Sequence, residues 1–430
     1  MQLVEHKVYG KGKVIKKRYG GFELYIEFED GILRWVRRDE VRFLVEKPLI
    51  TKYKPSRLIL SEEQFMAREI IEALRLGIVP QGYVEKFTFG RSKELKQIKD
   101  WLNESSEGTL VVIGEYGSGK SHLLEYMYSM ALKDNWAVSI VEIGRNENPF
   151  HKPYQVYQQI VKNFKFPWNG KIYDFRHFIR RIVNDKKSPL LESHIYFRRL
   201  IQLLKTSGWS YYSPDEELVW EWFEGEYDWF KPRLYKVGTA ANIYCYILNG
   251  ISWSSREILG LKGLLLLFDE SENISEVDYK YQFEKGRNFV MGLILLSNNI
   301  QSLLEEQIND ELIGFETNLR YCGYPSNNPI RFAWKLPSHL KVVFAFTPDW
   351  KYERNMIHLE MLKEDILEIM LEKIITFYKD AYNINIDKTI SKKLFSKLPK
   401  DNIRLFIKGS VEALDLIRFH PNKSVEELLK

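Results

Sequence analysis

The stretch VVIGEYGSGKSHLLEY, residues 111–126, constrains the fold more than any other part of the chain. An apolar run leads into Gly114, four residues follow, and Gly119, Lys120 and Ser121 complete the pattern G-x-x-x-x-G-K-S. Such a loop turns backbone N–H groups around phosphates, and its lysine neutralises their charge. The loop needs a buried strand before it and a helix after it. The sequence therefore predicts an α/β P-loop NTPase fold with a parallel sheet.

We expect this loop to hold ATP together with Mg²⁺, which the Ser121 hydroxyl would ligate. The residues expected to contact the nucleotide here are Gly114, Gly117, Ser118, Gly119, Lys120, Ser121 and His122. The apolar run LLLLFDE ends in Asp269 and Glu270, as a strand would that delivers a carboxylate to the metal. Asp269 is expected to hold Mg²⁺ through water, and Glu270 to polarise the attacking water.

Three further residues each leave two interpretations open. Thr347 follows the apolar strand KVVFAFT, where it either holds the attacking water or simply caps the strand before a proline. Arg404 lies early on a predicted C-terminal helix and either reaches the phosphates or stays solvated. Glu272 either supports Asp269 or is a surface carboxylate.

The chain between Lys120 and Asp269 is much longer than a plain core of this kind needs, so a helical insertion is predicted at about 150–260. An arginine from a neighbouring subunit often completes such sites. Four arginines are candidates, and the sequence does not choose among them: Arg287, Arg320, Arg331 and Arg354.

The N-terminal 1–44 segment has a different pattern. Two runs of alternating apolar and polar residues are separated by turn signals, which predicts a small SH3-like β-barrel. Residues 45–60 contain two prolines and are expected to form a linker. Residues 1–60 hold 14 Lys/Arg and 8 Asp/Glu, whereas the rest of the chain is close to neutral. This basic excess favours an acidic partner for the N-terminal module.

Helix signals organise the remainder. Ser61 and Gln64 form a capping box at the start of a helix, and the ATPase core is expected over residues 61–355. Residues 356–430 are expected to form a C-terminal helical lid. Within the insertion, Ser213 is the predicted cap of another helix.

Composition excludes several classes of protein. A chain of 430 residues suggests two to four domains. Its apolar runs are far shorter than the roughly 18 residues that cross a bilayer, so we expect a cytoplasmic protein without a membrane span. The two cysteines, Cys245 and Cys322, lack the spacing of a zinc site or a disulfide framework.

Five motifs occur in an order that resembles one family: AREIIEALRLGIVP, GEYGSGKSHLLEY, NPFHKPYQVYQQI, LLLLFDESEN and FAFTP. They resemble the ATP-binding proteins of BREX phage-defence systems, the BrxD-like P-loop family, over roughly residues 61–420. That family is AAA+-like and similar in layout to helicase-loader ATPases. The resemblance implies sensor roles for Thr347 and Arg404. It also implies a box near the adenine, matched here by Gly90, Arg91, Glu94 and Leu95.

The resemblance further implies defence against foreign DNA together with a helicase or another DNA-processing protein. The N-terminal module departs from this family. Its signature of His6, Tyr9, Gly10, Gly12 and Val14 is similar to Tudor/SH3-like modules of UvrD/PcrA-type helicases and CarD-type factors. Those modules bind RNA polymerase, other proteins or nucleic acid.

Two functions remain open at this point. The first is an ATPase acting on or near duplex or single-stranded DNA, with the barrel as adaptor. The second is a nucleotide-dependent switch in which ATP drives homo-oligomerisation and turnover resets it. A non-enzymatic scaffold is disfavoured by Lys120, Asp269 and Glu270. A steady rate of ATP hydrolysis that DNA stimulates would favour the first function. A very slow rate together with ATP-driven oligomerisation would favour the second.

Overall fold

The computed structural model describes residues 3–18, 23–44, 60–78, 82–104, 106–206, 215–226, 230–234, 240–305, 319, 330–348 and 355–429. The chain divides into two compact units, Met1–Leu60 and Ser61–Lys430. Among the helices in these ranges, none combines the length and the apolar character needed to cross a bilayer.

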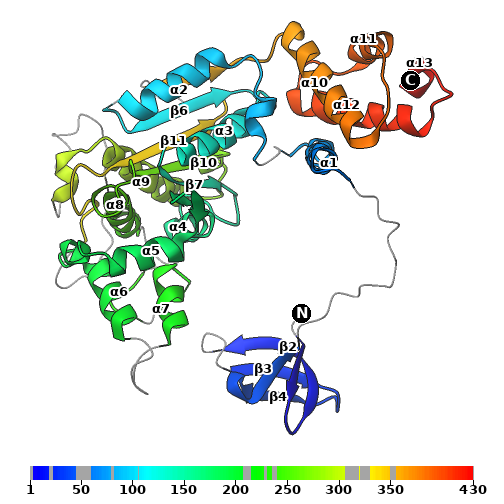
Figure 1. Cartoon of the computed structure of the whole chain (residues 1–430). Coiled ribbons are helices and arrows are strands. Elements are labelled where there is room, and N and C mark those ends of the chain that lie inside the picture. Colours follow the sequence, from blue (N-terminus) through cyan, green and yellow to red (C-terminus); the bar gives the residue numbers. More distant parts are fainter. Residues whose placement is uncertain are drawn as a thin grey trace. The chain divides into compact units, whose positions relative to one another are not determined.

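The first unit is an antiparallel sheet in the order β4-β3-β2-β1-β5, curled into a half-barrel (Figure 1). Its strands are β1 Leu3–His6, β2 Gly10–Arg18, β3 Glu23–Phe28, β4 Leu33–Arg37 and β5 Val41–Leu44. The core consists of Val4, Leu24, Ile26, Phe28 and Val36. The predicted small β module is confirmed, while its likeness to Tudor/SH3 modules stays a prediction.

The second unit contains a five-stranded sheet in the order β12-β6-β11-β10-β7, and every pairing in it is parallel. The strands are β6 Thr109–Gly114, β7 Ala137–Glu142, β10 Leu264–Asp269, β11 Leu340–Phe346 and β12 Met356–Leu359. Successive side chains of β10 enter different clusters, with Leu266 on one face and Leu267 on the other. Both faces are therefore buried, which explains why the strands read as continuous apolar runs.

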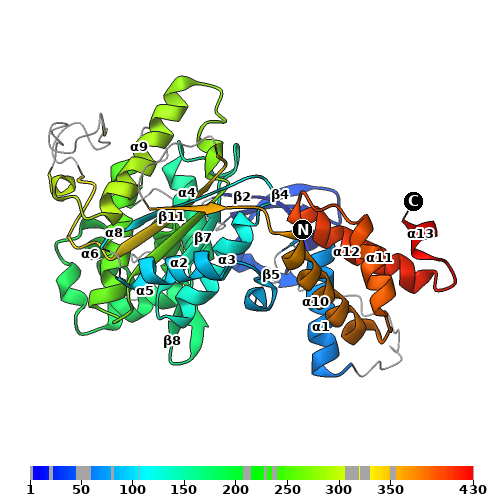
Figure 2. The ribbon, with the colours of Figure 1, turned by 90° about the horizontal axis from the view of Figure 1, so that it is seen from above.

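Helices cover both faces of this sheet (Figures 1 and 2). On one face lie α2 Ser92–Glu104 and α3 Lys120–Lys133. The other face packs against α4 Pro153–Asn163, α8 Ala241–Glu257 and α9 Lys280–Ser297. The predicted parallel sheet with helices is thus confirmed.

The C-terminal helices form a separate cluster whose composition was not anticipated. Its members are α1 Glu62–Arg75, α10 Glu364–Tyr382, α11 Lys388–Lys397, α12 Ile403–Phe419 and α13 Val425–Leu428. The α1 helix starts with the predicted capping box, but its apolar stripe packs against α10 and α12 and not against the sheet. This cluster, called the helical cluster below, therefore draws residues from both sides of the division at residue 356.

Residues 356–359 also differ from expectation. They were predicted as part of a helical lid, but they form β12, which pairs with β6 at the edge of the sheet. A four-residue strand is too short to show a periodic pattern in the sequence. Its apolar residues Ile357 and Leu359 are buried against α2 and α3.

The insertion expected at about 150–260 contains helices and one hairpin among its described residues. It comprises α5 Phe175–Asn184, α6 Ile195–Thr206, α7 Glu216–Phe223 and the hairpin of β8 Phe166–Trp168 and β9 Lys171–Tyr173. The cap of α7 is Asp215, whose carboxylate accepts a hydrogen bond from the Glu217 N–H. The predicted cap was Ser213, which lies outside the described residues, and this prediction was wrong. Aspartate caps helices as well as serine does.

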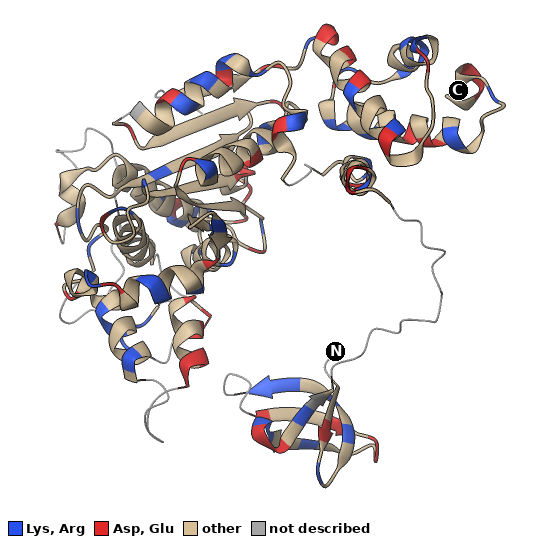
Figure 3. Ribbon diagram, in the orientation of Figure 1, with Lys and Arg blue, Asp and Glu red and all other residues tan. Residues whose placement is uncertain are grey.

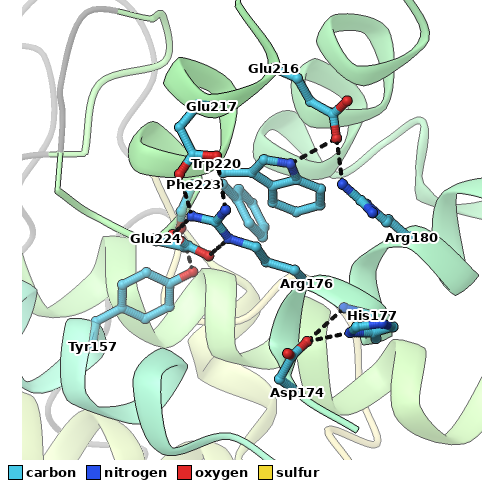
Figure 4. A network of polar contacts seen from close by, with 10 residues as sticks. All are labelled: Tyr157, Asp174, Arg176, His177, Arg180, Glu216, Glu217, Trp220, Phe223 and Glu224. Carbon is cyan, nitrogen blue, oxygen red and sulfur yellow. Dashed lines mark hydrogen bonds and ion pairs between the residues drawn. The ribbon is translucent and has the colours of Figure 1, made fainter. Parts of the chain in front are cut away.

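A polar network fixes α7 to α5 (Figure 4). Arg176 donates from Nε and Nη2 to the two carboxylate oxygens of Glu224, at 2.6 and 2.7 Å, and its guanidinium also binds Glu217. Beside it, Glu216 accepts from both Arg180 and the indole of Trp220. These paired hydrogen bonds fix direction as well as distance, so α7 is held in one orientation on α5.

Candidate functional site

A pocket opens between the loop after β6, the strand end at Glu270 and the helical cluster. One wall is polar and consists of Arg91, Glu270 and the loop residues from Tyr116 to His122. The rest of the lining is mostly apolar. It includes Leu74, Ile78, Phe87, Phe89, Leu123, Leu362, Met370, Ile403 and Ile407. The pocket therefore suits a ligand with one charged end and one flat apolar end.

The glycine-rich loop has the backbone that its sequence predicts. Gly117 and Gly119 have φ angles of +82° and +96°, which L side chains rarely adopt. Gly114 ends β6, and a Cβ there would lie 2.4 Å from the Ser118 hydroxyl. The Ser118 hydroxyl oxygen is buried and has no hydrogen-bond partner among the described residues.

The α3 helix begins at Lys120, with Ser121 as its second residue. The Lys120 side chain is only 8% exposed, and its ammonium donates to the Gly114 carbonyl at 2.8 Å. Backbone N–H groups at the start of a helix lack partners within the helix, and they attract anions. An ammonium and a helix N-terminus thus meet at the polar wall of the pocket.

Carboxylates gather beside this lysine. Asp269 ends β10 and accepts a hydrogen bond from the Glu270 N–H at 3.0 Å. Glu270 has a φ of +53°, and it lines the pocket. Burial raises the pKa of Glu270, and the nearby Asp269 and Glu272 raise it further. Burial likewise raises the pKa of Glu125 on α3, with Asp269 adding to the effect.

Glu272 is half-buried, so it is not the fully solvated carboxylate that was one of its two interpretations. Burial raises the pKa of Glu272, and its Oε2 has no hydrogen-bond partner among the described residues. In the ranges that the structure describes, no group of three or more His, Cys, Asp or Glu is placed to hold a metal ion. A cation here would need most of its ligands from a bound molecule, as Mg²⁺ commonly does with phosphates.

The strand order places Thr347. Because β11 lies between β6 and β10, the residue that follows it lies between the glycine-rich loop and Asp269. Thr347 is that residue, and it is half-buried. The carboxyl ends of three neighbouring parallel strands thus supply the loop, Thr347 and the carboxylates.

The Gly90–Leu95 box that precedes the glycine-rich loop contributes to packing as well as to the pocket. A Cβ at Gly90 would lie 3.0 Å from the Ile366 side chain at the start of α10. Arg91 donates from Nη2 to the Ser118 carbonyl at 2.9 Å and to the Glu360 carbonyl at 2.7 Å, and from Nη1 to Glu94. One guanidinium therefore joins the glycine-rich loop to the connection between β12 and α10.

His122 is neutral in the fold. The Thr88 hydroxyl donates to the Val84 carbonyl at 2.8 Å, so it accepts a hydrogen bond from the His122 Nε2–H at 2.9 Å. Burial lowers the pKa of His122 to about 4, and the charge of Arg91 contributes. His122 therefore brings no positive charge to the polar wall.

The helical cluster touches the loop at three consecutive residues. Asn402 caps α12, and a Cβ at Gly117 would lie 2.6 Å from its amide group. The next residue, Ile403, donates its N–H to the Gly117 carbonyl at 3.3 Å. Arg404 is exposed and donates to the Tyr116 hydroxyl at 3.4 Å.

Sequence reasoning found Arg404 but missed Asn402, Tyr116 and Thr88. Asn402 did carry a signal, because an asparagine before an apolar run is a helix cap. Nothing in the sequence shows that this cap meets the loop. Of the four arginines considered for a neighbouring subunit, Arg287 and Arg331 are exposed, on α9 and before β11. Arg320 and Arg354 lie outside the described residues.

Residues 63–185 match the family model described as the BREX system ATP-binding protein BrxC/D. The matched range runs from α1 past the glycine-rich loop to the end of α5. The resemblance to this family is thus confirmed over that range. No curated protein matches the chain.

Proposed function

We propose that this chain, which resembles BREX ATP-binding proteins over residues 63–185, is a Mg²⁺-dependent P-loop ATPase of AAA+-like type in phage defence. One observation carries the proposal. The pocket joins the glycine-rich loop and Lys120 at its polar wall to an apolar wall that the helical cluster contributes. A nucleoside triphosphate has the matching division into anionic phosphates and a flat base.

In this proposal the phosphates bind at the glycine-rich loop, where the N-terminus of α3 and the Lys120 ammonium attract anions. The Lys120 ammonium exchanges the Gly114 carbonyl for the β- and γ-phosphates. The buried Ser118 hydroxyl and the loop N–H groups offer further donors. The base packs between apolar side chains such as Phe89 and Ile407.

The carboxylates fit a divalent cation. Glu125, Glu270 and Glu272 all have raised pKa values because they are partly buried beside Asp269 or one another. A cation near Asp269 and the Ser121 hydroxyl would relieve this repulsion. When bound, Mg²⁺ neutralises charge on the β- and γ-phosphates.

Glu270 is the proposed general base. Its raised pKa makes it a better proton acceptor than an ordinary glutamate, and it lies at the pocket wall. Thr347 lies between Glu270's strand and the loop, where its hydroxyl could hold the attacking water. Because the base must be ionised, turnover should fall as the pH is lowered, and a bound cation, which favours the ionised carboxylate, shifts this fall to lower pH.

The decisive experiment separates binding from hydrolysis. Lys120→Ala should abolish tight binding of ATP in calorimetry, whereas Lys133→Ala, at the exposed end of the same helix, should not. Glu270→Gln should still bind ATP but lose turnover by about 10²-fold or more, the usual contribution of a general base. Glu276→Gln is the matched control: Glu276 lies on the same connection between β10 and α9, and its replacement should leave turnover unchanged. Unchanged ATP affinity in Lys120→Ala would contradict the phosphate site.

The family points to other components of the BREX system as partners. We propose a DNA-processing protein such as a helicase among them, and RNA polymerase or DNA as alternatives at the N-terminal unit. The contact of α12 with Gly117 favours a second candidate, a switch in which the nucleotide state sets the position of the helical cluster. Light scattering of Glu270→Gln with and without ATP tests whether ATP drives homo-oligomerisation.

A further inference from the structure

The sheet of the first unit has an outer face with an unusual row of side chains. In β3 and β4, Leu24, Ile26 and Val36 enter the core. Residues in alternate positions point to the opposite side. There Tyr25 lies between Lys16 on β2 and Trp35 on β4, its two cross-strand neighbours.

The two aromatic rings form a stacked pair on this face. The centroids of Tyr25 and Trp35 are 4.8 Å apart, with an angle of 29° between the rings. Trp35 is 38% exposed, and the Arg18 guanidinium lies 4.1 Å from its ring centroid. An exposed indole and a half-buried phenol ring thus lie outside the core, which comprises five buried side chains in the part of this unit that the structure describes.

The face is also basic. The β2 strand contains five lysines or arginines and no carboxylate, and Figure 3 shows these residues in blue. In the cross-strand register, Arg18 and Arg37 flank Glu23, and Lys13 lies opposite Glu27. Arg18 forms an ion pair with Glu23, and Arg37 forms one with Asp39. Lys16, in contrast, lies opposite the Tyr25 ring.

This combination discriminates between partners. A cross-strand pair of aromatic rings stabilises a sheet, and a solvated face would account for the lysines; the 38% exposure of Trp35 is what leaves a ring accessible to a partner. Duplex DNA offers phosphates but keeps its bases within the helix, where these rings cannot reach them. Single strands present unpaired bases that stack on aromatic side chains, while basic residues follow the backbone.

We propose that the outer face of β2, β3 and β4 binds single-stranded nucleic acid. A base stacks on the Tyr25–Trp35 pair in place of the Arg18 guanidinium, which pairs with Glu23 in the free protein, and phosphates lie along Lys13 and Lys16. Binding involves no residue of the nucleotide pocket. It therefore survives Lys120→Ala, so this proposal and the proposed ATPase function can fail separately.

The test uses the full chain without ATP and measures fluorescence anisotropy of labelled oligonucleotides. We expect a thymidine 20-mer to bind more tightly than a 20-base-pair duplex. Trp35→Ala should weaken single-strand binding about tenfold, the loss expected for one stacked base. Trp35→Phe should restore most of it. Phe419→Ala is the matched control, because Phe419 is exposed and also has an arginine guanidinium near its ring.

Two further readouts separate stacking from charge. Lys16→Glu should reduce the slope of log affinity against log salt by at least about 0.7, the value for one phosphate contact to a single strand, because the new carboxylate also repels the strand. An abasic strand of equal length should bind the unchanged protein with about the same affinity as a normal strand binds the Trp35→Ala variant. Thermal melting must show that Lys16→Glu and Trp35→Phe remain folded.

Three results would overturn the proposal. One is equal or tighter binding of duplex, and another is equal losses in Trp35→Ala and Phe419→Ala. The third is an absence of oligonucleotide binding. If the Trp35→Ala variant then also fails to bind a protein component of the defence system that the unchanged chain binds, this face is a protein interface.

Discussion

Replacing Gly117 by alanine should destabilise the second unit by about 2–3 kcal/mol, and the structure divides this cost into two parts. An L residue in the left-handed region costs about 1–2 kcal/mol, and Gly117 has a φ of +82°. The new Cβ would also lie 2.6 Å from the Asn402 amide. That amide cannot move freely, because its oxygen accepts the Leu405 N–H at the start of α12. Displacing it removes a helix cap worth about 1 kcal/mol.

Two matched variants isolate these parts in urea unfolding. Gly119 has a φ of +96° but open space around its Cβ position, so Gly119→Ala should cost only the backbone strain. Asn402→Gly removes the obstructing amide, and glycine replaces a cap at a cost of a few tenths of a kcal/mol. The double variant Gly117→Ala with Asn402→Gly should therefore be about 1 kcal/mol more stable than additivity predicts. Additive effects, or equal losses in Gly117→Ala and Gly119→Ala, would show that the α12 cap does not press on the loop.

Three other changes test individual residues. The folded chain holds the pKa of His122 at about 4, below the ordinary 6.5, so protonation of this histidine favours the unfolded chain as the pH falls from 6.5 to 4. The free energy of unfolding should therefore decrease by up to about 3 kcal/mol over this range, and His122→Gln should abolish that decrease. Urea unfolding at several pH values measures it. Asp269→Asn should raise the Mg²⁺ concentration needed for half-maximal turnover, with little change in the melting temperature. Arg404→Ala should slow hydrolysis while the melting temperature stays within a degree or two, since the side chain is exposed; a collapse of both would make Arg404 structural.

The parts of the fold that the sequence predicted are those specified locally. The loop from Gly114 to Ser121 needs glycines at fixed offsets, and β10 is a continuous apolar run that ends in carboxylates. The capping box of α1 is equally local. Each of these signals depends on neighbours within a few residues, so reading them requires no knowledge of the tertiary structure.

What the sequence could not predict depends on contacts between distant residues. The apolar stripe of α1 fits any apolar surface, so its packing on α10 leaves no mark in its own pattern. The contact of Asn402 with Gly117 joins residues almost 300 positions apart. Glu125 looks like an ordinary polar residue of α3, and only the fold brings it near Asp269.

The double hydrogen bond of Arg91 has a mechanical consequence. A single nitrogen, Nη2, holds both the Ser118 carbonyl and the Glu360 carbonyl. The loop and the chain segment that leads into α10 therefore share one anchor point. Rotation of the helical cluster about this point can keep both bonds, whereas a shift away from the sheet must break one of them. Any movement of the cluster that separates Glu360 from Ser118 therefore has the loss of an Arg91 hydrogen bond as part of its cost.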